Sequence, residues 1–84
     1  MAQDAVELFD KELARNPRDR VLRSGRARAL RHLAYAYRRN GNLKDARAAI
    51  EQAIAAQEQV VNEAPADKGE REQLTTSRKV LASL

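Results

Sequence analysis

Three helix-breaking pairs divide this chain of 84 residues into four segments. The pairs are Asn16-Pro17, Asn40-Gly41 and Ala64-Pro65. Proline removes a backbone donor that a helix interior needs, and glycine adopts the left-handed conformation that closes a helix. Each pair is therefore a point where one helix ends and the next can begin, and every element of the fold has to fit between these points.

Apolar residues recur at spacings of three and four within each segment, which is the period of a helix and not of a strand. The spacing predicts helices over residues 4–15, 18–39, 43–63 and 67–83. Their apolar stripes are Val6/Phe9/Leu13, Leu22/Leu30/Leu33/Tyr37, Leu43/Ala46/Ile50/Ala53/Gln57/Val60 and Leu74/Ser77/Leu81/Leu84. We expect an all-α fold of two antiparallel helical hairpins, in a single domain of residues 1–84, because so short a chain buries only a modest core.

Acidic pairs at the start of the first and last segments have the spacing of capping boxes. Asp4 precedes Glu7 by three residues, and Asp67 precedes Glu70 by three. In such a box the first side chain accepts from a backbone N–H and the second reaches back to the first. We therefore interpret both pairs as helix caps and not as general acid–base pairs.

Small residues indicate how the second and third segments pack. Ala34, Ala46 and Ala53 would let two antiparallel helix backbones approach closely, with larger apolar residues filling the space beside them. Gly25 is a weak point, since glycine costs about 1 kcal/mol relative to alanine in a helix interior. Because of this weak point, the second helix could bend near Ser24-Gly25.

A shift of the chain by 48 residues aligns it with itself at cap and core positions. Pro17 falls on Pro65, Asp19 on Asp67, Leu33-Ala34 on Leu81-Ala82 and Ala5-Val6 on Ala53-Ile54. These matches predict an internal repeat. The chain would then hold the second half of one unit, one whole unit, and the first half of another.

Residues 27–58 resemble a tetratricopeptide repeat. Leu30 takes the large apolar position of that motif, Leu33-Ala34 the Leu-Gly position, Tyr37 the tyrosine position, and Ala46, Ile50 and Ala53 the apolar positions of the second helix. Glu58 stands where the family has proline, and the proline comes later, at Pro65. The resemblance implies a right-handed helical array of lengthened units of about 48 residues, with residues 4–15 and 67–83 as partial units.

Residues with the chemistry of an active site are scarce. His32 is the one histidine, there is no cysteine, and the three glycines are isolated, so no phosphate-cradling loop is formed. We expect no enzyme, no catalytic or metal site and no cofactor. The chain has no apolar run long enough to span a membrane and no basic leader of a signal peptide, and we expect a cytoplasmic protein.

Positive charge is concentrated in the middle of the chain. Residues 14–50 hold eleven Lys and Arg against two acids, a net +9, whereas residues 1–13 carry −3 and residues 51–84 carry −2. The resemblance places one face of the second helix along the concave groove of the array. The residues that would line this groove are Arg28, Arg31, His32, Tyr35 and Arg38. Some family members clamp a peptide carboxylate there, but Tyr35 stands where such a clamp has asparagine.

Several roles for the arginines remain open. They can bind an acidic or amphipathic segment of a protein partner, since guanidinium groups pair with carboxylates in bidentate fashion. They can bind nucleic acid through its phosphates, or form a solvated face that pairs with acids of neighbouring helices. The chain can also self-associate through its terminal helices, with Leu74, Leu81 and Leu84 as contact residues. Our leading interpretation is a non-catalytic protein–protein interaction module, a scaffold or adaptor, and the alternative is a basic helical nucleic-acid-binding domain.

Overall fold

The computed structural model describes residues 2–84, which form four α-helices and no strand. The helices are α1 (Ala2–Arg15), α2 (Arg20–Arg39), α3 (Leu43–Glu63) and α4 (Lys68–Ala82). The prediction of an all-α fold with four helices is confirmed, and the bounds of the third helix agree at both ends. The breaks fall at the three pairs that contain proline or glycine.

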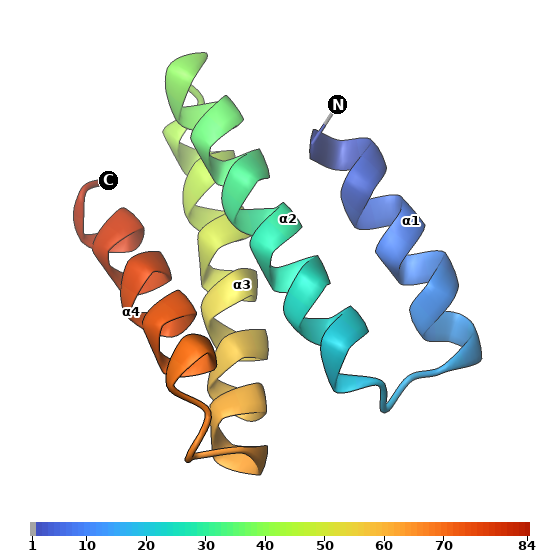
Figure 1. Ribbon diagram of the computed structural model, residues 1–84. Helices are drawn as coiled ribbons and strands as arrows, with labels where there is room; N and C mark the ends of the chain where they lie inside the picture. The colour runs from blue at the N-terminus through green and yellow to red at the C-terminus, as the bar shows by residue number, and fades with distance from the viewer. Residues whose placement is uncertain (1) are drawn as a thin grey trace.

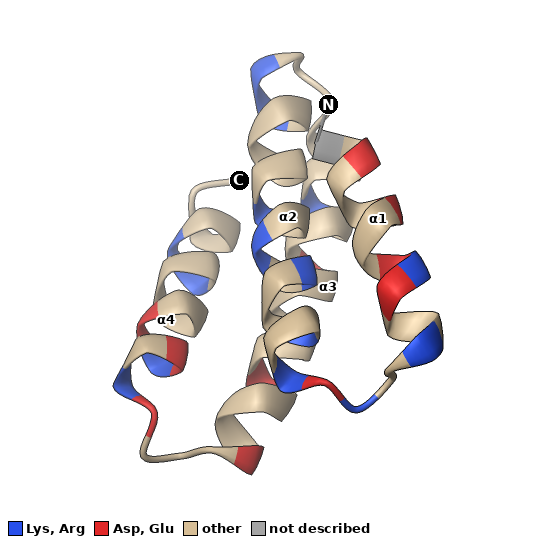
Figure 2. Ribbon diagram, turned by 45° about the vertical axis from the view of Figure 1, so that its right-hand side comes forward, with Lys and Arg blue, Asp and Glu red and all other residues tan. Residues whose placement is uncertain are grey.

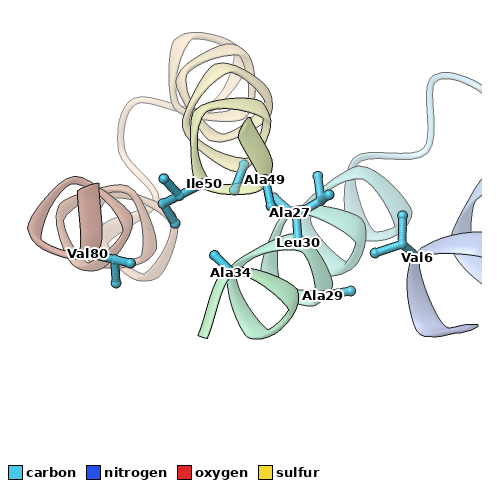
Figure 3. Packing of buried hydrophobic residues seen from close by; sticks show 9 residues of the cluster. Val6, Ala27, Ala29, Leu30, Ala34, Ala49, Ile50 and Val80 are labelled. Carbon is cyan, nitrogen blue, oxygen red and sulfur yellow. The ribbon is translucent and has the colours of Figure 1, made fainter. Parts of the chain in front are cut away.

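Helix α2 is the centre of the molecule (Figure 1). Consecutive helices run antiparallel and pack against each other, and α4 also touches α2. Helix α1 packs against α2 alone among the described helices. Seen along the helices, α3 covers one side of α2, while α1 and α4 lie on its two flanks (Figure 3). One face of α2 therefore remains open to solvent between α1 and α4.

The contact between α2 and α3 is built from alanines (Figure 3). Ala27, Ala46 and Ala53 are fully buried, and Ala34 is almost so. Because a methyl group is the whole side chain, the two helix backbones come close, and Leu30 and Ile50 fill the space beside them. The predicted small contact residues Ala34, Ala46 and Ala53 all lie in this core.

Side chains at the predicted starts cap three helices. Asp19 Oδ1 accepts from the Leu22 N–H at 3.1 Å, and Asn42 Oδ1 accepts from the Asp45 N–H at 3.3 Å. Gly41 has φ +77°, the left-handed conformation expected where α2 ends. Each cap satisfies a backbone donor that the first turn of a helix leaves without a partner.

Neither predicted capping box forms. Asp4 lies inside α1, which already includes Ala2, so it is not the cap. Asp67 does cap α4, accepting from the Glu70 N–H at 3.2 Å. The Glu70 carboxylate does not reach back, however, and instead accepts from Ser24 Oγ of α2 at 2.8 Å. Packing of α4 beside α2 offers this carboxylate a buried hydroxyl, and the Asp67 N–H donates to the Ala64 carbonyl.

The two proline turns have the same hydrogen bonds 48 residues apart. Asn16 N–H donates to Glu12 O at 3.1 Å, and Ala64 N–H donates to Val60 O at 3.0 Å. Asp19 N–H then donates to Asn16 O at 3.1 Å, and Asp67 N–H to Ala64 O at 3.0 Å. In both turns the aspartate goes on to cap the next helix. The α1–α2 and α3–α4 connections therefore share one geometry.

Gly25 is a point of close approach between helices. It is buried within α2, which is one continuous helix from Arg20 to Arg39. A Cβ atom at Gly25 would lie 2.5 Å from Cε1 of Phe9 in α1, which is closer than two non-bonded carbon atoms approach each other. The absence of a side chain at Gly25 is therefore what lets the Phe9 ring rest on the backbone of α2.

We expect Gly25→Ala to lower the free energy of unfolding by about 1–2 kcal/mol, because overpacking outweighs the gain in helix propensity. Phe9→Leu replaces the ring by a smaller side chain and should remove this clash. In that background, Gly25→Ala should raise the free energy of unfolding instead of lowering it. Chemical denaturation of the two single variants and the double variant measures this coupling.

Gly69 in the first turn of α4 is the matched control. The atom nearest to an added Cβ there is Asp67 Oδ1 at 3.4 Å, an ordinary contact distance. Gly69→Ala should therefore raise the free energy of unfolding by about 0.5–1 kcal/mol. Equal responses at the two glycines would contradict the role assigned to Phe9.

Candidate functional site

Four of the five predicted groove residues lie on or beside the open face of α2. Arg28, His32 and Arg38 are exposed, and Tyr35 is half-buried. We call these four residues the α2 strip. Since α3 packs against the opposite side of α2, the strip faces solvent between α1 and α4 (Figures 1 and 3).

Tyr35 is held between two neighbours in the α2 strip. The His32 ring meets it edge-on, with the ring centroids 6.0 Å apart and the planes at 71°. The Arg38 Cζ atom lies over the Tyr35 ring, 5.4 Å from its centroid, within the range of a cation–π contact. Arg38 Nη1 also donates to Ser83 Oγ at 3.0 Å, which ties the strip to the end of α4.

Arg31, the fifth predicted groove residue, does not line the open face. It is 9% exposed and lies against α4. Its Nη1 donates to the backbone oxygen of Gln73 at 3.3 Å and to Ser77 Oγ at 3.5 Å. A buried guanidinium needs such acceptors to offset its lost hydration. Arg31 therefore acts in the packing of α4 on α2, and its placement in the groove was wrong.

A depression of about 370 Å³ lies between α1 and α2 next to the strip. It is lined by Ala5, Phe9, Gly25, Arg28, Ala29 and His32. Alanine, glycine and phenylalanine form its walls, while Arg28 and His32 bring basic groups to its rim. The sequence indicated Arg28 and His32 but not the apolar residues, because the depression exists only where α1 crosses the bare backbone of Gly25.

Two other arginines of α2 pair with acids of neighbouring helices. Arg23 Nη1 and Nη2 each donate to one oxygen of the Glu63 carboxylate at 2.6 Å, joining α2 to the end of α3. Arg26 Nε donates to Asp10 Oδ1 of α1 at 2.5 Å. Figure 2 shows acidic residues distributed along α1 and basic residues along α2. Part of the central positive charge is thus neutralised within the fold.

Arg28 differs from these arginines in having no hydrogen-bond or ion-pair partner within residues 2–84. No acidic residue lines the depression beside it. An exposed guanidinium next to apolar walls can take an external carboxylate or phosphate. Among the arginines of the predicted site, Arg28 is therefore the one with unused binding capacity and an adjoining hollow.

The paired carboxylate and guanidinium of Glu63 and Arg23 shift each other's pKa. Hydrogen bonds from Arg23 lower the pKa of Glu63 below its ordinary value, and the Glu63 carboxylate raises the pKa of Arg23. Both groups are therefore charged across the neutral range. This pair holds the first turn of α2 close to the end of α3.

The residues predicted to mediate self-association are wholly or partly buried in their own chain. Leu74 is 6% exposed, so it is buried in its own chain, and Leu81 and Leu84 pack partly against the core. The outward side of α4 is polar and carries Lys68, Arg71, Glu72, Thr75, Thr76 and Lys79. Leu8 of α1, which lies outside the predicted apolar stripe, is 63% exposed. The position of Leu8 outside that stripe could have indicated its exposure from the sequence.

Within the described part of the chain, no group of three or more histidine, aspartate or glutamate side chains is placed to hold a metal ion. The same residues include no helix with the length and apolar character needed to cross a membrane. No family model matches the chain, and comparisons with curated proteins and with solved structures find no significant match. The tetratricopeptide resemblance of residues 27–58 stays a prediction.

We expect the Arg23–Glu63 ion pair to make a pH-dependent contribution to the free energy of unfolding. Because the pKa of Glu63 is lowered in the folded state, the unfolded chain binds the proton more readily. The contribution is complete above the ordinary glutamate pKa of about 4.3 and is lost as pH falls through the lower, folded value. The midpoint temperatures of thermal unfolding of the wild-type chain and of Glu63→Gln should differ at neutral pH and become equal in acid.

Glu58→Gln is the control for this titration. Glu58 Oε2 lies 3.6 Å from Arg78 Nη2, and both side chains are more than half exposed. Solvent-exposed pairs of this kind contribute little to stability, so Glu58→Gln should unfold like the wild type at every pH. A difference between wild type and Glu63→Gln that persists unchanged into acid would contradict the assignment to the ion pair.

Proposed function

We propose that this chain is a non-catalytic protein–protein interaction module, a scaffold or adaptor that binds an acidic or amphipathic segment of a partner along the α2 strip. The observation that carries the proposal is the position of Arg28. Its guanidinium is exposed and has no partner among residues 2–84, and it stands at the rim of an apolar depression. A segment with a carboxylate next to an apolar side chain matches both features.

The arrangement of the strip supports this assignment. Arg28 can form bidentate hydrogen bonds with a carboxylate. Tyr35 is already restrained by His32 and Arg38, so less conformational entropy is lost when a ligand packs on it. The strip runs along a continuous helix, which gives its side chains a fixed spacing.

We further propose that the fold is a tetratricopeptide-like array. Support comes from the motif in residues 27–58 and from the two turns with matching hydrogen bonds. In that family the first helix of each unit lines the concave groove, and α2 would be such a helix. A cytoplasmic setting agrees with the absence of cysteine in the sequence.

The alternative proposal is a nucleic-acid-binding domain. It is favoured by the net charge of +9 over residues 14–50, since clustered bases bind phosphates without sequence preference. Two features weigh against it. Arg23 and Arg26 are already paired with acids of the same chain, and Arg31 is buried.

The test compares binding of two fluorescent probes to the wild-type chain and to Arg28→Glu. One probe is a synthetic peptide of glutamate and leucine residues, and the other is a random-sequence single-stranded DNA. We expect the peptide to bind and Arg28→Glu to weaken it about tenfold, because a charge-assisted hydrogen bond contributes about 1.5–3 kcal/mol.

Arg47→Glu on α3 is the charge-matched control. Arg47 is exposed, and its helix lies on the opposite side of α2 from the strip. This variant should retain the peptide affinity. If both variants weaken the peptide equally, only net charge matters and the strip is not the site. Preference for the DNA probe, with affinity that falls steeply with salt, would favour the alternative.

A further inference from the structure

Three side chains of α2 donate hydrogen bonds to α4, namely Ser24, Arg31 and Arg38. They are spaced seven residues apart, so they form one stripe along α2. The donor–acceptor distances run from 2.8 Å at Ser24 Oγ to 3.5 Å between Arg31 Nη1 and Ser77 Oγ. Since α2 also packs on α3, this stripe seats α2 in the groove that α3 and α4 form (Figures 1 and 3).

Helices α3 and α4 correspond to α1 and α2, since each pair is joined by one of the two matching proline turns, 48 residues apart. The residues that line the depression beside Arg28 therefore have counterparts in the groove between α3 and α4. The counterparts of Ala5, Phe9, Gly25, Arg28, Ala29 and His32 are, in the same order, Ala53, Gln57, Gln73, Thr76, Ser77 and Val80.

The groove between α3 and α4 is filled by α2. Ala53, Gln57 and Ser77 are fully buried there, and the Arg31 guanidinium lies against Ser77. Within residues 2–84, no helix holds the same place on α1 and α2. The depression therefore stays open, as does the edge of α1 beside it, where Leu8 is 63% exposed. The filled groove shows that the element which fits such a place is a helix.

The two grooves differ in charge, and the difference selects the chemistry of the occupant. Neutral Thr76 and Val80 stand in the filled groove where the depression has Arg28 and His32. The filled groove receives the guanidinium of Arg31 on oxygen acceptors. The depression instead offers the exposed guanidinium of Arg28, and none of its lining residues among those described is acidic. A carboxylate is therefore favoured at the place that an arginine takes in the filled groove.

We propose that the partner segment bound at the α2 strip is an α-helix, seated on α1 and α2 as α2 is seated on α3 and α4. Its three contact residues are spaced seven apart, and the central one is a glutamate that pairs with Arg28. The outer two are apolar and rest on Leu22 and Tyr35, the positions that correspond to the outer contacts of α2 on α4. Glu12, which lies beside Leu22, disfavours a second carboxylate at that end. This inference rests on the proposed function, to which it adds the conformation and residue spacing of the partner.

The test uses fluorescent peptides of about 20 residues, the length of α2. The first has leucine, glutamate and leucine at spacings of seven in a helical frame of alanine and glutamine. In the second the glutamate is moved by two positions, onto another face of the helix. The third has a proline on each side of the glutamate, which prevents a helix. We expect the first to bind at least about tenfold more tightly than the others, and its carbon-13 chemical shifts to become helical on binding.

Charge exchange identifies the residue that the central position meets. Arg28→Glu should weaken the first peptide at least about tenfold and should bind a version with lysine in place of the glutamate, which the wild-type chain should not bind. Lysine at either outer position should give no such recovery. Arg47→Glu on α3 is the matched control, because Arg47 is exposed on a helix away from the depression. It should leave the affinities for both peptides as in the wild type.

The outcomes separate this inference from the proposed function. Equal binding of the helical and proline-containing peptides, weakened alike by Arg28→Glu, would keep the strip as the site but refute a helical partner. Failure of every peptide, including the glutamate–leucine probe described above, would refute the proposed function as well. A wild-type chain that sediments as a dimer and excludes the helical peptide would assign the groove to a second copy and overturn the inference.

Discussion

The structure depends on how closely α2 approaches its neighbours. Alanines at Ala27, Ala46 and Ala53 set its distance from α3, and the bare backbone of Gly25 sets its distance from α1. Such packing yields less apolar burial per residue than large side chains do, but it brings polar groups of different helices within hydrogen-bonding range. The ion pairs of Arg23 and Arg26 and the contact of Ser24 with Glu70 follow from that proximity.

The architecture was predictable because it is encoded locally. Proline and glycine set the ends of the helices, and apolar spacing indicated the buried face of each. Two of the errors concern contacts between α2 and α4. Glu70 was assigned to its own cap and Arg31 to the groove, because the rotation of one helix against another is decided by packing that periodicity does not describe. The same limit explains why the apolar depression beside Arg28 was missed.

The two surfaces of interest differ in how their chemistry arises. The α2 strip consists of residues that the sequence already marks as unusual, namely a lone histidine, a tyrosine and arginines within an alanine-rich helix. The edge of α1 is unremarkable in sequence, and its Leu8 becomes notable only because no neighbouring helix within residues 2–84 covers it. The first surface is therefore defined by residue type, and the second by architecture.

The matching proline turns make the segment from residue 17 to residue 64 a self-consistent building block. It begins just after Asn16 and ends at Ala64, two positions with equivalent hydrogen bonds. A duplicated copy of this segment could be joined to the original through a junction that the chain already uses. Longer designed arrays would then need no new loop, and the length of the groove could be varied without altering the helices that form it.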